Sequence, residues 1–190
     1  MTPTESAAAK PQLITPTFVL AWVANFCQFL VFYLFVTTMA LYAVESFGAS
    51  DTVGGFASSA FVLGATCMRV FSGWIVDRVG HKKAALTSLV FVTVVAVAYF
   101  FAHNVAVLII VRMVHGAGYA LTSTALMAVA QSVIPHERRA EGTGYFALGT
   151  TLATAFGPAI GLLLANNIGY TTLFAAALGA NIVSLILALV

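Results

Sequence analysis

Long apolar stretches, each of about 20 residues or more, follow one another along this chain of 190 residues. A stretch of that length crosses the hydrocarbon core of a bilayer, about 30 Å, as a helix. The chain is 61% hydrophobic and 7% charged, whereas an ordinary soluble domain carries about 25% charged residues. Spanning backbones in lipid must be helices or a closed barrel, and these stretches are too long for barrel strands of about 10 residues. The sequence therefore predicts an all-α membrane protein.

The apolar stretches predict a helical bundle behind a short polar tail. We expect residues 1–16 to be a disordered cytoplasmic tail and residues 17–190 to be the transmembrane bundle. No cleavage site follows the first apolar stretch, so this stretch is a retained span and not a signal peptide. The expected spans cover residues 18–44, 53–76, 84–102, 105–132, 143–165 and 171–190.

The basic residues lie in alternate connections between the expected spans. The segments ESFGASD (45–51), HN (103–104) and NNIGY (166–170) contain no Lys or Arg. Connections rich in Lys and Arg remain on the cytoplasmic side of a membrane. The pattern predicts a multi-pass protein of the cell membrane with a cytoplasmic N-terminus, and the net charge of +2 gives no reason to expect a nucleic-acid partner. The basic residues of the tail and the two other connections are Lys10, Arg78, Lys82, Lys83, Arg138 and Arg139.

The segment GWIVDRVGHKK combines a carboxylate with glycines and basic residues between two spans. It resembles the signature loop between helices 2 and 3 of the major facilitator superfamily, with His81 in place of the usual first basic residue. The resemblance implies that Asp77 meets the N-terminus of a helix in another half of the transporter and releases it when the transporter changes state. Such a contact contributes about 0.3–1 kcal/mol when exposed and up to about 2 kcal/mol when partly buried. The alternative is a cytoplasmic anchor alone. The gating motif comprises Gly73, Asp77, Arg78, Gly80, Lys82 and Lys83.

The fourth span, with VRMVHGAGYALTSTA, places Arg112, His115 and Tyr119 on one helical face. Arg112-x-x-His115-Gly116 resembles the helix-4 motif of the same family, with His115 where Gln is commoner. The resemblance implies that Arg112 takes part in proton handling, and the alternative is an arginine that snorkels to the outer interface. His115 is a proton carrier or a hydrogen-bonded core histidine, and the residues favour neither.

The fifth span has small residues at every fourth position, which lets helices approach closely. Pro158 should bend this helix because it donates no backbone hydrogen bond. The pattern resembles the helix-5 motif of exporting members of the family, with Ala153 replacing one glycine, and it is the main reason for preferring export to uptake. The alternative is a packing stripe without further function. The motif comprises Gly144, Gly149, Ala153, Gly157, Pro158 and Gly161.

Further polar residues lie in the first and second spans. Asn25 and Gln28 share one face of the first span, where they line a cavity or form a helix–helix hydrogen bond. Arg69 continues a stripe with Gly73 and Asp77, and exporters often carry an arginine there, although snorkelling explains it equally well. The third and sixth spans have few polar residues and are expected to face lipid. This distribution fits a 3+3 inverted repeat, in which corresponding helices line the cavity.

The resemblance covers residues 17–190 and only the first six of the family's usual twelve helices. We therefore expect a partial chain whose partner is a C-terminal six-helix half or, as the minority alternative, a second copy of this chain. The other expected partners are the lipid bilayer and a small-molecule substrate.

The expected function is secondary transport by alternating access, with proton-coupled export of a small molecule. The alternatives are an uptake symporter and a six-helix membrane partner without transport activity. No metal-ligand cluster or nucleophile–base pair is apparent in the sequence, so we expect neither an enzyme nor a cofactor, and the proton gradient is the expected energy source. No Asp or Glu lies in the middle of a span, which leaves His115 as the candidate titrating group in the membrane.

Overall fold

The computed structural model describes residues 12–190, so residues 1–11 of the expected tail lie outside the described part. Within these residues all regular structure is helical, and six helices are long and apolar enough to cross a membrane, which confirms the prediction of an all-α membrane protein. Short 3-10 helices follow α3 and precede α5. The elements are α1 (Pro16–Phe47), α2 (Asp51–Val79), α3 (His81–Ala98), η1 (Tyr99–Phe101), α4 (Val105–Val133), η2 (His136–Arg138), α5 (Arg139–Asn167) and α6 (Tyr170–Leu189).

Polar side chains cap the first turns of α1, α2 and α4. The backbone N–H of Phe18 donates to Thr15 Oγ1 at 3.2 Å at the start of α1, and the N–H of Val107 donates to Asn104 Oδ1 at 2.9 Å at the start of α4. Each bond satisfies a backbone donor that has no partner inside its helix. The starts of these helices are therefore set locally by the sequence, whereas no described side chain caps α3, α5 or α6.

The connection between α2 and α3 is a single residue, Gly80, and is much shorter than the expected loop 77–83. Gly80 has a φ of 92°, a conformation that glycine adopts without steric cost. Asp77 therefore lies in the last turn of α2, and Lys82 lies in the first turn of α3. The charged motif forms two helix ends that meet at a tight corner.

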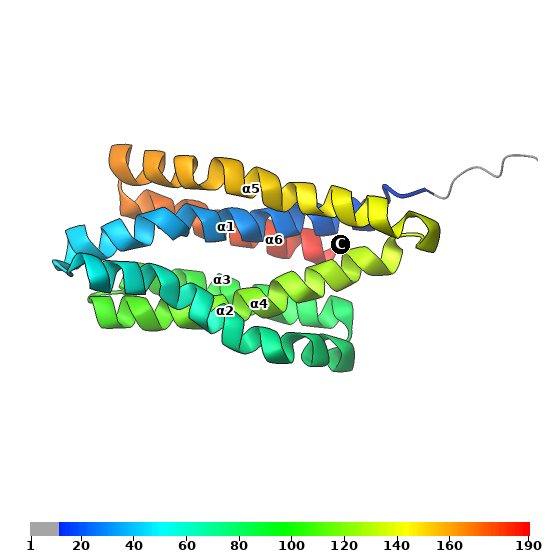
Figure 1. Ribbon diagram of the computed structural model, residues 1–190, viewed down its shortest axis with the longest axis horizontal. Helices are drawn as coiled ribbons and strands as arrows, with labels where there is room; N and C mark the ends of the chain where they lie inside the picture. The colour runs from blue at the N-terminus through cyan, green and yellow to red at the C-terminus, as the bar shows by residue number, and fades with distance from the viewer. Residues whose placement is uncertain (1–11) are drawn as a thin grey trace, which may run out of the picture.

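The two three-helix repeats, α1–α3 and α4–α6, exchange helices between the two sides of the bundle. Figure 1 shows α1, α5 and α6 on one side of the bundle and α2, α3 and α4 on the other. The first helix of each repeat thus packs against the second and third helices of the other repeat, and α1 also crosses α4 in the centre. Because α1 and α4 run in opposite directions, the arrangement is the predicted 3+3 inverted repeat.

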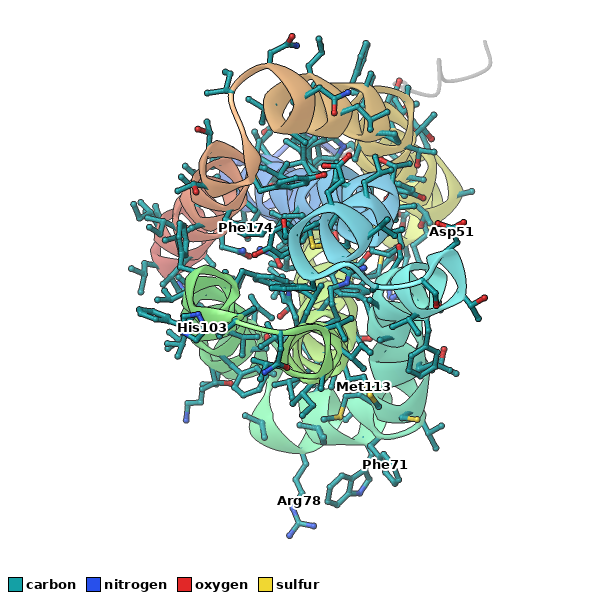
Figure 2. The ribbon with its side chains drawn as sticks, turned by 90° about the vertical axis from the view of Figure 1, so that its left-hand side faces the viewer. Asp51, Phe71, Arg78, His103, Met113 and Phe174 are labelled. Carbon is teal, nitrogen blue, oxygen red and sulfur yellow. The ribbon has the colours of Figure 1, made fainter. Side chains whose placement is uncertain are left out.

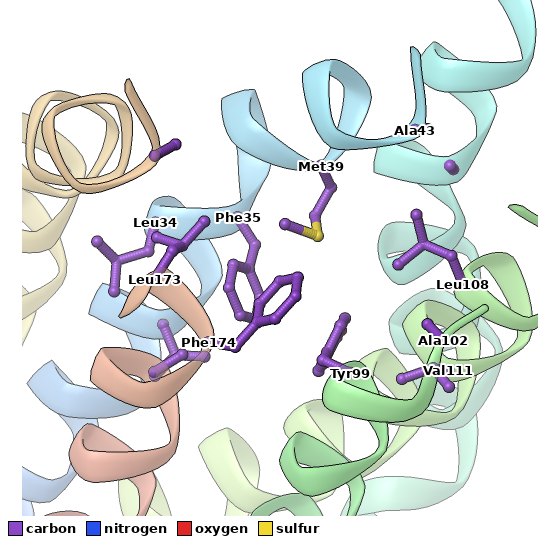
Figure 3. Close-up of a cluster of buried hydrophobic side chains, with 14 residues drawn as sticks. Leu34, Phe35, Met39, Ala43, Tyr99, Ala102, Leu108, Val111, Leu173 and Phe174 are labelled. Atoms are coloured by element: carbon purple, nitrogen blue, oxygen red, sulfur yellow. The ribbon is translucent and has the colours of Figure 1, made fainter. Parts of the chain in front are cut away.

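A buried hydrophobic cluster with aromatic side chains from α1, η1 and α6 lies away from the charged turns. The ring centroids of Phe35 and Tyr99 lie 4.9 Å apart, and those of Tyr99 and Phe174 lie 5.6 Å apart. Figure 3 shows Phe35, Tyr99 and Phe174 directed toward one another, with Leu108 and Met39 beside them. The cluster fastens α1 to α4, α6 and η1 at that end of the bundle.

Two glycines bring the backbones of α2 and α4 into contact. A Cβ atom on Gly64 would lie 1.9 Å from the carbonyl oxygen of Met113, and a Cβ atom on Gly116 would lie 1.9 Å from that of Phe61. Helices in lipid associate largely by van der Waals packing, which small residues make possible. Gly116 belongs to the predicted motif of the fourth span, whereas Gly64, the other glycine of this contact, was not predicted.

We expect Gly64→Ala and Gly116→Ala each to destabilise the bundle by at least about 3 kcal/mol, the upper end of the usual cost of overpacking, because each new methyl group meets backbone. The apparent melting temperature in detergent should fall by about 2–4 °C for each kcal/mol. Gly55→Ala on α2 is the matched control, since no atom lies within 4 Å of its Cβ position. Unchanged melting of both variants would show that α2 and α4 are not in contact at these residues.

Candidate functional site

A cavity of about 440 Å³ lies between α1, α2, α4 and α5. We call it the central cavity. It includes hydroxyl, amide and guanidinium groups along an otherwise apolar wall, which is unusual inside a membrane bundle. The helices α3 and α6 contribute no residue to its wall. It is lined by Asn25, Phe29, Arg69, Ser123, Thr124, Met127, Phe146, Ala147, Thr150 and Thr151.

Arg69 is the cationic side chain of the central cavity. Its Nη2 donates to Ser123 Oγ at 3.5 Å, and no carboxylate within the described residues pairs with it. Arg69 also lines a neighbouring pocket of about 220 Å³, together with Phe32 and Tyr119. Arg69 therefore stands between two open spaces on the same face of the bundle.

The structure separates the roles of Asn25 and Gln28, which the sequence left open. Gln28 Nε2 donates to Asn181 Oδ1 on α6 at 2.9 Å, so Gln28 forms a helix–helix hydrogen bond. Asn25 lines the central cavity, is only 2% exposed, and has no hydrogen-bond partner within residues 12–190. The sixth span is consequently not a featureless lipid-facing helix, because Asn181 and Ser184 are buried there and Ser184 Oγ donates to the Ala24 carbonyl at 3.0 Å.

Arg112 is fully buried inside the bundle and does not snorkel to an interface. Its Nη2 donates to the carbonyl of Ser58 at 2.8 Å, and its Nε donates to the carbonyl of Ala57 at 3.4 Å. The guanidinium lies 4.8 Å from the ring centroid of Phe61 and 5.9 Å from that of Phe35. Carbonyl dipoles and aromatic faces thus surround the charge, whereas Nη1 has no hydrogen-bond partner in the described part of the chain.

His115 and Tyr119 lie on the buried side of α4, as the spacing of this face predicts. His115 Nδ1 is 3.0 Å from the hydroxyl of Tyr99, and its ring stands edge-on to the ring of Phe61. The arrangement is that of a hydrogen-bonded core histidine. Tyr119 stacks on Phe32 with ring centroids 5.7 Å apart and forms part of the wall of the smaller pocket.

The gating motif lies on the outer side of α2. A Cβ atom on Gly73 would have no atom within 4 Å, and Asp77 is exposed, without an ion-pair or hydrogen-bond partner among residues 12–190. Arg78 lies over the ring of Trp74, 5.3 Å from its centroid, and Figure 2 shows it pointing away from the other helices. No other helix of the described bundle therefore makes a close contact at Gly73.

The stripe of small residues on α5 is the contact between α5 and α1. A Cβ atom on Gly157 would lie 2.5 Å from Tyr33 Cβ, and one on Gly161 would lie 2.5 Å from the carbonyl oxygen of Leu34. Gly149 faces Trp22, and Ala153 is fully buried. Pro158 lies within the continuous helix α5, whereas Gly144 is exposed and faces open space.

Most of the chain matches a known protein family. The family model described as "Major Facilitator Superfamily" matches residues 21–190. The chain belongs to this superfamily. As a major facilitator protein with six spanning helices, it is a multi-pass membrane protein.

Curated relatives of this major facilitator chain include exporters. It is 31% identical over 123 residues to the staphylopine export protein of Staphylococcus aureus, which is 64% of this chain and 31% of that relative. It is 30% identical over 161 residues to the multi-drug resistance efflux pump PmrA of Streptococcus pneumoniae, 82% of this chain and 39% of the pump. The chain thus spans well under half the length of these relatives.

The hydrogen bond between Gln28 and Asn181 gives a test of this superfamily member's packing. Gln28→Leu should destabilise the bundle by about 1–2 kcal/mol, because it leaves the buried Asn181 oxygen without a donor. Gln28→Leu combined with Asn181→Leu should recover part of that loss, with a coupling energy of about 0.6–1.7 kcal/mol in a double-mutant cycle. Additive losses in thermal unfolding would argue against the bond.

Proposed function

We propose that this chain forms one six-helix half of a transporter that exports a small molecule across the cell membrane, driven by the proton gradient. The observation that carries the proposal is the central cavity, which brings Asn25, Arg69 and Ser123 to one face of a membrane bundle. Polar groups within spanning segments mark substrate and ion pathways. The names of the two relatives, an export protein and an efflux pump, support export rather than uptake.

A second six-helix bundle would complete the transport pathway. The cavity of this chain opens on one face, and the stripe of Arg69, Gly73 and Asp77 runs along α2 beside it without contacts from the other helices that would cover Gly73 or Asp77. Alternating access would follow from rocking of the two bundles about the cavity. A carboxylate at Asp77 is suited to bind a helix N-terminus of the second bundle and to release it in each cycle.

The proposed orientation places the charged turns in the cytoplasm. Figure 1 shows the start of α1, the α2–α3 corner, the α4–α5 connection and the end of α6 at one end of the bundle. That end carries Lys82, Lys83, Arg138 and Arg139, whereas the connections at the opposite end have no Lys or Arg. The positive-inside rule then places the first end in the cytoplasm.

Arg112 is the proposed electrostatic element of proton coupling. A guanidinium remains charged in proteins, so Arg112 acts by its fixed charge and does not carry the proton itself. Its burial beside His115 and the carbonyls of α2 lets that charge act through a medium of low dielectric. A rearrangement of α2 against α4 would change the hydrogen bonds of Arg112 and the position of its charge. Movement of a proton through the transporter would in this way be coupled to the conformational change.

Replacement of Asp77 by Asn tests the gate. Asp77→Asn should slow transport about two- to thirtyfold, the rate equivalent of the helix-terminus contact, and leave membrane abundance unchanged. The measurement is proton-gradient-driven uptake of fluorescent dyes, anionic and cationic, into inside-out vesicles that contain the native-length protein. Glu137→Gln, an exposed acid near the same end, is the matched control. Transport at the normal rate would exclude a gating role for Asp77.

Replacement of Arg112 tests proton coupling. Arg112→Ala should abolish dye uptake driven by a pH gradient, because the coupling charge and its hydrogen bonds to α2 are lost, while dye exchange without a gradient persists because the residues that line the central cavity are unchanged. Arg112→Lys keeps the charge but loses the paired carbonyl contacts, and it should retain a fraction of driven uptake. Full driven uptake in Arg112→Ala would leave Arg112 a structural residue. Dye movement in the opposite direction would identify an uptake symporter.

A further inference from the structure

We infer that the central cavity binds the negatively charged group of a small organic anion, with Arg69 as the binding cation and Asn25 as a hydrogen-bonding partner. This inference rests on the proposed transport function, since the anion would be the transported molecule. It concerns the class of substrate, which the names of the relatives do not assign to this chain.

Arg69 lies well inside the spanning part of α2. It precedes Asp77 by eight residues on α2, which places it about 12 Å along the helix from the charged end. A charge at that depth is costly unless water or an opposite charge meets it. The other two arginines of α2 and α4 have protein partners: Arg112 has carbonyls and aromatic rings, and Arg78 has Trp74. Arg69 has a single long hydrogen bond, to Ser123.

The described acidic residues lie away from the central cavity. None of the described Asp or Glu residues lines the central cavity or the smaller pocket beside it, and each lies near a helix end. The cavity therefore has a positive potential that attracts an anion and disfavours a cation. The described acids are Glu45, Asp51, Asp77, Glu137 and Glu141.

The wall of the central cavity carries hydrogen-bond donors. Asn25 is 2% exposed, lines the cavity, and has no partner for its amide in the part of the chain that the structure describes. The Asn25 amide is thus available to a molecule in the cavity, and its two N–H donors suit carboxylate, sulfonate or phosphate oxygens. The hydroxyl group of Thr150 on α5 adds a further donor to the same cavity.

The remaining wall determines the rest of the molecule. Phe29, Met127 and Phe146 present apolar surface to the same cavity. A volume of about 440 Å³ holds a small amphipathic molecule. The chemistry of the cavity is therefore that of an organic anion with an apolar portion.

A competing explanation is that a carboxylate of a second bundle neutralises Arg69. The experiment must therefore report the potential of the cavity in the native-length protein. Thr151→Cys provides a reporter in a Cys27→Ala, Cys67→Ala background, because Thr151 lines the cavity and its hydroxyl bonds only to the carbonyl of Ala147, at 3.3 Å.

Two thiol reagents of similar size and opposite charge are the probes: sulfonatoethyl methanethiosulfonate, an anion, and trimethylammonioethyl methanethiosulfonate, a cation. We expect the anion to modify Thr151→Cys roughly tenfold faster than the cation, relative to their rates with a free thiol, since a charge near Arg69 interacts at moderate dielectric. Arg69→Gln should abolish the preference, and Arg69→Lys should keep it.

Equal rates for the two reagents, or a faster cation, would overturn the inference and indicate a neutralising carboxylate or a cation site. The absence of reaction with either reagent would also overturn it, because the cavity would then be closed to ions. Dye uptake by the same variants separates the two proposals. Uptake without an anion preference would refute the substrate class alone, whereas an anion preference without proton-driven uptake would refute the transport mechanism.

Discussion

The close approach of helix backbones at small residues is the constraint on which the rest of this bundle depends. Lipid tails are as apolar as leucine, so burial of apolar surface does not drive the helices together, and tight packing must do so. Gly64 with Gly116 sets the distance between α2 and α4, and Gly157 with Gly161 sets that between α5 and α1. These two contacts are equivalent in the two repeats, because each joins the second helix of one repeat to the first helix of the other. They hold the walls of the central cavity in place and leave one face of the bundle open.

Two arginines within the membrane occupy opposite surroundings, and this difference organises the proposed mechanism. Arg112 is enclosed by the carbonyls of α2 and by aromatic rings, so its charge acts on the protein itself. Arg69 is open to the cavity and has one long hydrogen bond within the described residues, so its charge acts on a molecule that enters the cavity. Both side chains form hydrogen bonds between α2 and α4, the most closely packed pair of helices. A small shift between these helices would therefore reach both the coupling site and the binding site.

Several features followed from the sequence because they depend on local chemistry. Gly80 allows a positive φ, which produces a corner even shorter than the expected loop. The regular spacing on α4 placed His115 and Tyr119 on one buried side. Gly64 and Asn181 were missed, because a glycine or an amide within an apolar stretch gives no signal of its partner. Their importance arises only when Met113 and Gln28, which are distant in the sequence, lie against them.

The sequence by itself determined that the protein lies in a lipid bilayer, that its spans are helices, and that these helices alternate in direction. Hydrophobic length and backbone hydrogen bonding are properties of each segment alone. The sequence also supplied the motifs that led to the superfamily. Only the tertiary structure decided that Asn25 faces the central cavity while Gln28 bonds to α6, and that Arg112 is enclosed while Arg69 is open. These outcomes depend on how neighbouring helices rotate and cross. Rotation and crossing are set by the sum of many contacts between distant residues, which no single segment encodes.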